Sequence, residues 1–335
     1  MRSVLLVATL TSLASAQQPP TLMVHRDSVR DFTTVASGIT MNPTKCDTSG
    51  AVYFRAYQHS NPYGASIIKL DPRDKSALSI DISKVSDSSV TKPSTLKFTD
   101  FAVVGGTIYV PAVNEDENAY VLEFAAEDGA FQRAITLEDN FYPVKIGAFT
   151  SGAFVVIGSM KHRNDRTGAV TLSSDSVLYD VSGRIGKHLG AVDNEVAGGM
   201  SRTITPEDLS NLSLGLVESS GVAICFLQPS AKLLITMHES GTIDLHKLWR
   251  PGQDLVAINL RASGDNVLVE YVKDPTKDGR FTEFVLYDTS TNQPLTIHQL
   301  DANVGGAFGC YDWRNTYTFL TNTSGHRGFL TATVR

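Results

Sequence analysis

Short apolar stretches separated by turn residues recur along this chain from Gly50 to its last residue, and this recurrence constrains the fold more than any motif does. The stretches are alternating or wholly apolar in character, and both patterns indicate β-strands when turn residues bound them. Most begin directly after Gly, Asp or Asn, as expected of a strand that is entered through a tight turn. The six clearest strands comprise residues 51–54, 107–110, 153–157, 222–227, 266–271 and 316–320.

Each of these strands belongs to a larger repeating unit. A second strand and a third, outer strand follow it, and a less regular apolar stretch such as 98–104 precedes it. The unit of four strands recurs at intervals of about 50 residues, close to the length of a propeller blade. Two longer intervals contain insertions, 83–93 and 191–211, and Thr205 to Asp208 in the second predicts a short surface helix. The sequence therefore predicts an all-β fold, a six-bladed β-propeller of four-stranded antiparallel blades.

The last unit predicts how the ring closes. It stops at Arg335 after its third strand, residues 329–334, and so lacks an outer strand. An N-terminal segment, 21–24 or 31–36, can supply that strand and cover an edge that would otherwise favour aggregation. We expect the first and last segments to pair in one sheet.

Composition and the first residues indicate an exported single domain. Charged residues make up 19% of the chain, and the net charge of −6 disfavours binding to nucleic acid. Arg2, a short apolar stretch and Ala14-Ser15-Ala16 predict a signal peptide, residues 1–16, that is too short to span a membrane. Residues 17–335 then form one propeller domain, and we expect a secreted or periplasmic monomer without a membrane span.

Three cysteines follow the predicted signal peptide. Cys46 and Cys310 each lie seven residues before a tyrosine, which predicts equivalent positions in the first and last blades, and ring closure makes these blades neighbours. A disulfide between them is one hypothesis, and two independent buried cysteines are the alternative. Cys225 lies in an apolar strand and is expected to be a buried free thiol. No Cys/His spacing typical of structural zinc is present.

One part of the first unit resembles a known group of propellers. Residues 46–54 and the strand 67–72, Ile-Ile-Lys-Leu-Asp-Pro, resemble the blade motifs of NHL and SMP-30-like six-bladed propellers. The chain is also similar in architecture to exported propeller proteins of acidobacteria. These families include lactonases, peptide lyases and binding modules, so the resemblance implies a fold and leaves the function open.

Loops between the second and third strands of each blade share one face with the connections between blades, and ligands often bind there. The polar residues of these loops are the candidate ligand-binding set: His59, Asn114, Glu115, Lys161, His162, Arg163, Lys273 and His326. The alternative is that exposed loops are simply polar. Trp249 and Trp313 are too far apart in sequence to indicate a platform that stacks on sugars.

A metal-dependent hydrolase of lactones or esters is the second hypothesis. It requires oxygen ligands that converge on Ca²⁺ or another divalent metal in the central channel, which the first strand of each blade is expected to line. The candidates are Asp47, Asp100, Glu218 and Asp312, and the alternative is that an Asp before a turn is a turn former. No nucleophile elbow or phosphate loop is present. The sequence favours a binding module for a protein or a polar envelope or matrix component over an enzyme, with no cofactor and no catalytic residues assigned.

Overall fold

The computed structural model describes residues 19–32, 39–58, 61–73, 76–164, 166–190, 215–228, 233–248, 255–273, 282–291, 293–300, 306–323 and 326–335. Its regular structure consists of strands β1 to β25 and two short 3₁₀ helices, η1 (Ile82–Lys84) and η2 (Pro93–Thr95). The helix predicted at 205–208 and the predicted signal peptide lie outside the described residues. No described helix is long and apolar enough to cross a bilayer.

The first half of the chain forms three sheets of consecutive strands. The first contains β2 (Ile39–Cys46), β3 (Val52–Gln58), β4 (Asn61–Leu70) and β5 (Ala77–Asp81). The second contains β6 (Lys97–Phe98), β7 (Ala102–Val104), β8 (Thr107–Val113), β9 (Ala119–Ala125) and β10 (Phe131–Thr136). The third contains β11 (Phe141–Ala148), β12 (Phe154–Arg163), β13 (Val170–Tyr179) and β14 (Ile185–His188).

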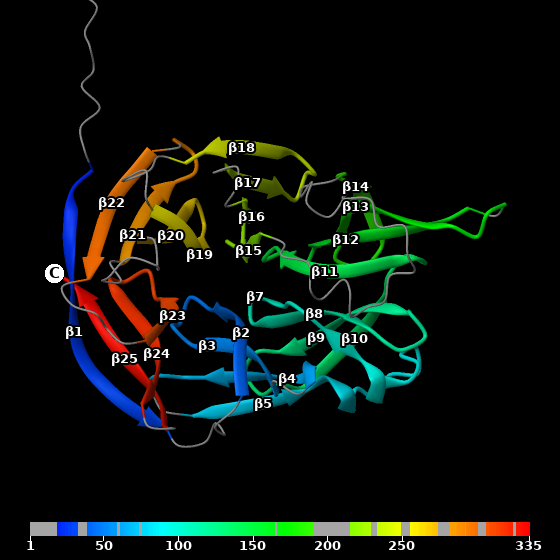
Figure 1. The fold of residues 1–335 in the computed structure, drawn as a ribbon, viewed down its shortest axis with the longest axis horizontal. Helices are drawn as coiled ribbons and strands as arrows, with labels where there is room; N and C mark the ends of the chain where they lie inside the picture. The colour runs from blue at the N-terminus through cyan, green and yellow to red at the C-terminus, as the bar shows by residue number, and fades with distance from the viewer. Residues whose placement is uncertain are drawn as a thin grey trace, which may run out of the picture.

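The second half forms one sheet of four strands and one of eight. The first of these contains β15 (Leu216–Ser219), β16 (Ala223–Gln228), β17 (Leu233–His238) and β18 (Ile243–Lys247). The eight-stranded sheet contains β19 (Leu255–Ser263), β20 (Asn266–Lys273), β21 (Thr282–Asp288), β22 (Gln293–Leu300), β1 (Thr21–Phe32), β25 (His326–Val334), β24 (Thr316–Thr323) and β23 (Gly306–Tyr311), in that order. Figure 1 shows all the sheets arranged around a central axis, with one edge of each smaller sheet and both edges of the eight-stranded sheet, β19 and β23, toward it. The chain is an all-β propeller.

The N-terminal strand closes the ring. β1 pairs antiparallel with β25 from Val24 opposite Val334 to Phe32 opposite Arg327, which confirms that the first segment supplies the strand missing from the last sheet. β1 also pairs in parallel with β22, a contact that the sequence did not predict. Val52 and Phe54 pack with Phe329 in an apolar cluster that joins the first and last sheets.

The strands that line the channel differ from those predicted. Residues 51–54 and their counterparts fall mainly in β3, β8, β12, β16, β20 and β24, which lie second from the axis, and the irregular stretches before them form the innermost strands (Figure 1). The inner strands are hard to recognise because regular alternation is interrupted in most of them. β2, β11, β19 and β23 each contain a register shift, and the inner edge of the second sheet is split into β6 and β7.

Candidate functional site

A cavity of about 350 Å³ opens where the inner strands turn back into the second strands of their sheets. Its volume lies within the range of about 300 to 1,000 Å³ that is typical of small-molecule sites. Each inner edge of the ring contributes lining residues; these are Cys46, Asp47, Thr48, Ser49, Val103, Val104, Gly105, Gly106, Thr150, Glu218, Ser219, Ser220, Gly221, Arg261, Ala262 and Trp313, with Ala126 beside them. The cavity is therefore one mouth of the central channel.

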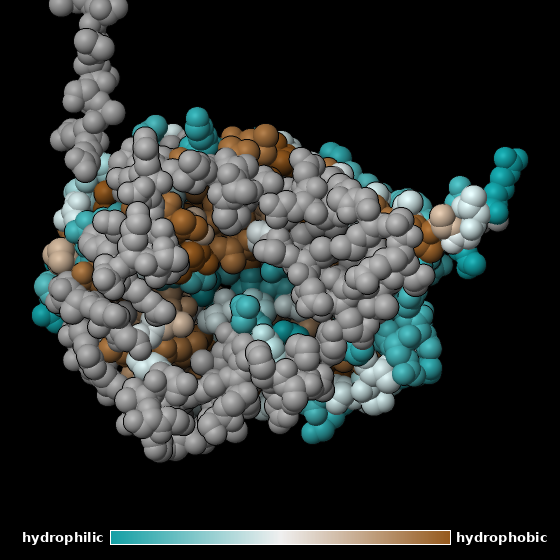
Figure 2. Space-filling view, in the orientation of Figure 1, coloured by the Kyte–Doolittle hydropathy of each residue, from teal (hydrophilic) through white to brown (hydrophobic). Residues whose placement is uncertain are grey.

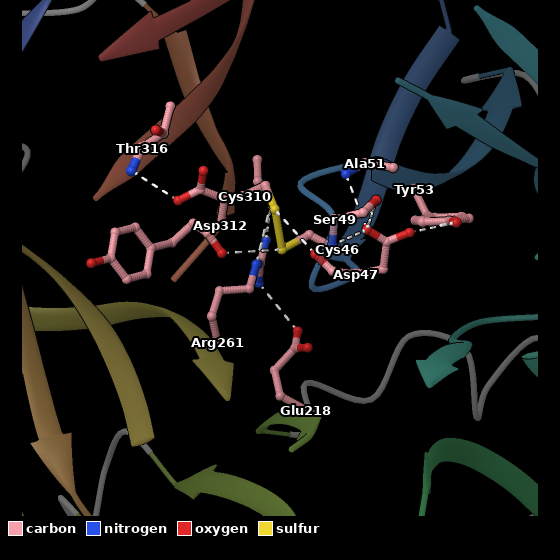
Figure 3. The surroundings of a disulfide bond; sticks show 12 residues. Cys46, Asp47, Ser49, Ala51, Tyr53, Glu218, Arg261, Cys310, Asp312 and Thr316 are labelled. Carbon is pink, nitrogen blue, oxygen red and sulfur yellow. Dashed lines mark hydrogen bonds and ion pairs between the residues drawn. A yellow bond between two sulfur atoms is a disulfide. The ribbon is translucent and has the colours of Figure 1, made fainter. Parts of the chain in front are cut away.

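Buried ion pairs between different sheets form the floor of this cavity. Glu218 on β15 accepts a hydrogen bond from Arg261 on β19 at 3.1 Å, and the Lys45 ammonium on β2 lies 3.4 Å from the same carboxylate oxygen. Arg261 also donates to the carbonyl of Gly309 on β23 at 2.9 Å, and Lys45 donates to the carbonyl of Val217. Figure 3 shows the Arg261 side chain between Glu218 and the Cys46–Cys310 disulfide. These side chains bridge the channel and connect inner strands far apart in sequence.

Two further charged residues lie in the channel beside this floor. Asp100 occupies the break between β6 and β7, is fully buried, and lies 3.6 Å from Lys45. Its other contact is a long hydrogen bond, 3.4 Å, from the backbone N–H of Ile146. Burial lowers the pKa of Lys145 on β11, although the nearby carboxylate of Asp100 acts in the opposite direction. Five of the inner edges therefore each contribute one charged residue to a layer across the channel. We call this the charged layer; its members are Lys45, Asp100, Lys145, Glu218 and Arg261.

A disulfide between Cys46 and Cys310 lies next to the cavity, with 5.4 Å between the Cα atoms (Figure 3). The predicted equivalence of the two positions is wrong. Asp47 and Asp312 begin matching turns, so Cys46 corresponds to Tyr311, and Cys310 is one residue out of step. Equivalent positions point the same way around the ring, and a one-residue offset reverses the direction of a strand side chain. The offset is what allows the two sulfurs to meet.

The four predicted metal ligands do not form one site. Asp47 accepts hydrogen bonds from Ser49, the Ala51 N–H and the Tyr53 hydroxyl, at 2.6 to 3.1 Å. Asp312 accepts from the N–H groups of Arg314 and Thr316, at 2.7 and 2.9 Å.

Asp47 and Asp312 are therefore turn formers, which is the alternative that the sequence left open. Asp100 and Glu218 instead face cations. No group of three or more His, Cys, Asp and Glu side chains in the described part of the chain is placed to hold a metal. The donor set does not fit the divalent metal.

The predicted loop residues that the structure describes lie at the opposite end of the ring, and most of them are engaged in local contacts. The Asn114 amide is buried and donates to Thr91, while its oxygen accepts from the backbone of Asp116 and Asn118. Glu115 pairs with Lys92 at 2.8 Å, and Lys161 pairs with Glu117 at 2.7 Å.

His162 and Arg163 lie near the tip of the β12–β13 hairpin, which projects outward from the ring in Figure 1. His59 and the side chains of Lys273 and His326 lie outside what the structure describes. Of the predicted residues, Cys46, Asp47 and Glu218 line the cavity.

Sequence reasoning missed Lys45, Lys145, Arg261 and Trp313. Lys45 immediately precedes a cysteine that was singled out, and Lys145 and Arg261 are lone cations within otherwise apolar stretches. Lone charges in inner strands are the signal that could have revealed the layer, because a buried charge needs a partner.

Comparisons with known proteins bear on the fold alone. No protein-family model and no curated protein sequence matches the chain. One similar solved structure is a catalytically inactive virginiamycin B lyase from Staphylococcus aureus with quinupristin, at 11% identity and a TM-score of 0.43, covering 91% of this chain and 99% of that one. A streptogramin B lyase shows 12% identity and a TM-score of 0.46, covering 92% and 97%. A chain of a mitotic checkpoint complex shows 10% identity and a TM-score of 0.46, covering 98% and 99%. The finer resemblance to NHL and SMP-30-like propellers stays a prediction.

Proposed function

We propose that this chain is an exported binding module whose ligand enters the cavity at the turn end of the channel. The partner is a protein or a polar component of the cell envelope or matrix. We count six blades, because the eight-stranded sheet consists of two four-stranded units joined through β1 and β22. The observation that carries the proposal is the cavity itself, to which the turns of every inner strand contribute.

Binding is better supported than catalysis because the ionisable groups of the cavity are already engaged. Asp47 accepts hydrogen bonds on both carboxylate oxygens, and Glu218 faces two cations through one of its oxygens. No histidine is among the described residues that line the cavity. A general base must be free to take a proton from the substrate, and neither carboxylate is poised for that task. The lactonase hypothesis is less well supported, since no three of the described His, Cys, Asp and Glu side chains are placed to hold one metal ion.

The charged layer makes the cavity suited to recognition. Residues fixed by ion pairs and backbone hydrogen bonds do not have to be ordered when a ligand binds, so less conformational entropy is lost. Arg261 is held by Glu218 and by the carbonyls of Leu260 and Gly309. The floor is therefore preorganised.

Retention of a partner by a cavity-filling variant tests the proposal. Thr48 is exposed and lines the cavity, so Thr48→Trp places a bulky side chain in the mouth. Ser94 is exposed on η2, away from the cavity lining, and Ser94→Trp is the matched control. Each immobilised protein is incubated with envelope and secreted fractions of the source organism.

We expect the wild-type protein and Ser94→Trp to retain the same components and Thr48→Trp to lose them. Equal retention by all three proteins, or retention of nothing by the wild type, would contradict the proposal.

A further inference from the structure

Among the described residues that line the cavity, Trp313 is the one aromatic side chain, and its backbone is strained. Its φ is 59°, in the left-handed region that bulky residues rarely adopt. The side chain is half-buried and packs edge-on against Tyr311, with ring centroids 5.3 Å apart. Strained residues of this kind occur most often at functional sites.

The matching turn of the first sheet shows that the turn itself does not require this strain. Asp47 and Asp312 organise the two turns through the same pattern of backbone hydrogen bonds. In the first turn the positive φ occurs only at Gly50, which corresponds to Asn315 in the last turn. Thr48, the counterpart of Trp313, has no positive φ. The turn can therefore form without a positive φ at this position. The strained backbone occurs in the turn that places an indole at the mouth of the cavity.

The polar groups of the floor offer both hydrogen-bond acceptors and donors. Glu218 is engaged through Oε1, and its Oε2 accepts no hydrogen bond from any described residue. The hydroxyl oxygens of Ser219 and Ser220 accept from the N–H groups of Ala148 and Ala223, at 2.9 and 3.0 Å. Their hydroxyl hydrogens are then left to donate, because a serine hydroxyl can accept and donate at once.

The charges on the floor select among classes of ligand. Lys45 and Arg261 already balance Glu218, so an ammonium ligand would find little net attraction. The same balance leaves an anion little net attraction, because the carboxylates of Glu218 and Asp47 line the cavity together with the Arg261 guanidinium. A neutral ligand with several hydroxyl groups can instead donate to Glu218 and accept from the serines. We propose that the cavity binds a neutral saccharide, with one sugar face stacked on the Trp313 indole and its hydroxyl groups on Glu218, Ser219 and Ser220.

Intrinsic fluorescence tests this inference, because Trp249 and Trp313 are the two tryptophans of the chain. In a Trp249→Phe protein all tryptophan emission comes from Trp313. The probes are maltotriose, cellotriose and N-acetylchitotriose as neutral saccharides, choline as a cation and succinate as an anion. We expect a saturable change in emission with at least one saccharide and no change with choline or succinate.

Two substitutions separate stacking from folding in calorimetric titrations with the responding saccharide. Trp313→Gly removes the indole and suits the positive φ, so the protein should fold while its affinity falls by roughly tenfold or more. Trp313→Phe should keep most of the affinity. Arg314→Gly alters the next residue of the same turn, which does not line the cavity, and should bind like the wild type.

The inference rests on the proposed function, and the outcomes distinguish their failures. A response to choline or succinate and to no saccharide would overturn the ligand class and leave the cavity as a binding site. No response to any probe, with Thr48→Trp still losing its partner, would overturn the saccharide alone. No response together with undiminished retention by Thr48→Trp would overturn both. Unchanged saccharide affinity in Trp313→Gly would overturn the role of Trp313.

Discussion

The Lys45 ammonium lies 3.4 Å from Glu218 Oε1 across the central channel, although the two residues belong to different sheets and are far apart in sequence. Lys45 also faces the buried Asp100 at 3.6 Å, so one cation holds two carboxylates. A buried ion pair is costly to form, and the loss of one partner leaves the other as an uncompensated charge. The channel layer is therefore the part of the fold in which a single substitution should have a large effect.

Lys45→Met tests this dependence. We expect the free energy of unfolding to fall by about 3–5 kcal/mol, because Asp100 loses the cation beside it. Urea denaturation measures the change. Lys92→Met is the control, since Lys92 pairs with Glu115 and Asp116 on the surface and its loss should change stability little. Equal effects of the two substitutions would contradict the account of the layer.

Thiol titration tests the disulfide and the state of Cys225. Burial raises the pKa of the Cys225 thiol to about 12, so Ellman's reagent at pH 8 should find no reactive thiol in the folded protein. Unfolding without reductant should release one thiol, and reduction should release all three. Three thiols in the unfolded, unreduced protein would exclude the Cys46–Cys310 bond.

Acid should destabilise the protein through His298. Burial lowers the pKa of this histidine to about 4, and its Nδ1 lies 2.6 Å from the Tyr317 hydroxyl. Between about pH 6.5 and pH 4 the unfolded chain therefore binds a proton that the folded chain does not, so stability is present above pH 6.5 and is lost as the pH falls. The loss should approach about 3 kcal/mol at pH 4.

The variant His298→Gln isolates this contribution from those of the other titrating groups. Urea denaturation from pH 7 to pH 4 should show a shallower loss of stability in the variant. Parallel curves for the two proteins would assign the acid sensitivity elsewhere.

The closing strand offers a paired comparison of neighbouring residues. Val24 on β1 is fully buried, whereas Met23 beside it is 37% exposed. Val24→Asp should lower the free energy of unfolding by at least about 3 kcal/mol, because it places a charge without a partner in the apolar cluster beneath β1. Met23→Asp should cost far less, and similar losses in urea denaturation would show that β1 does not close the ring as described.

The recurring apolar stretches predicted much of this fold but not the surface of the channel. Residues 51–54 and their counterparts stand out as apolar stretches because they lie within sheets that are covered on both faces, and Val52, Tyr53 and Phe54 are all fully buried. The incomplete last unit likewise indicated that an N-terminal strand would pair with β25.

The innermost strands have one neighbour and contain bulges, so their pattern is weak and most of the residues that line the cavity were not predicted. Long-range pairs such as Lys45 with Glu218 leave no local pattern at all, since they depend on how the sheets are placed around the axis. Figure 2 shows one face of the ring, on which hydrophilic and hydrophobic residues lie side by side near the centre.

Hydrogen–deuterium exchange, with and without the retained partner, tests the central claim that binding occurs at the turn end of the channel. The account predicts slower exchange in the turns around Thr48, Ser220 and Trp313, which line the cavity. Protection confined to the loop that contains Asn114 and Glu115 and to the tip of the β12–β13 hairpin, with unchanged exchange in the cavity turns, would contradict it.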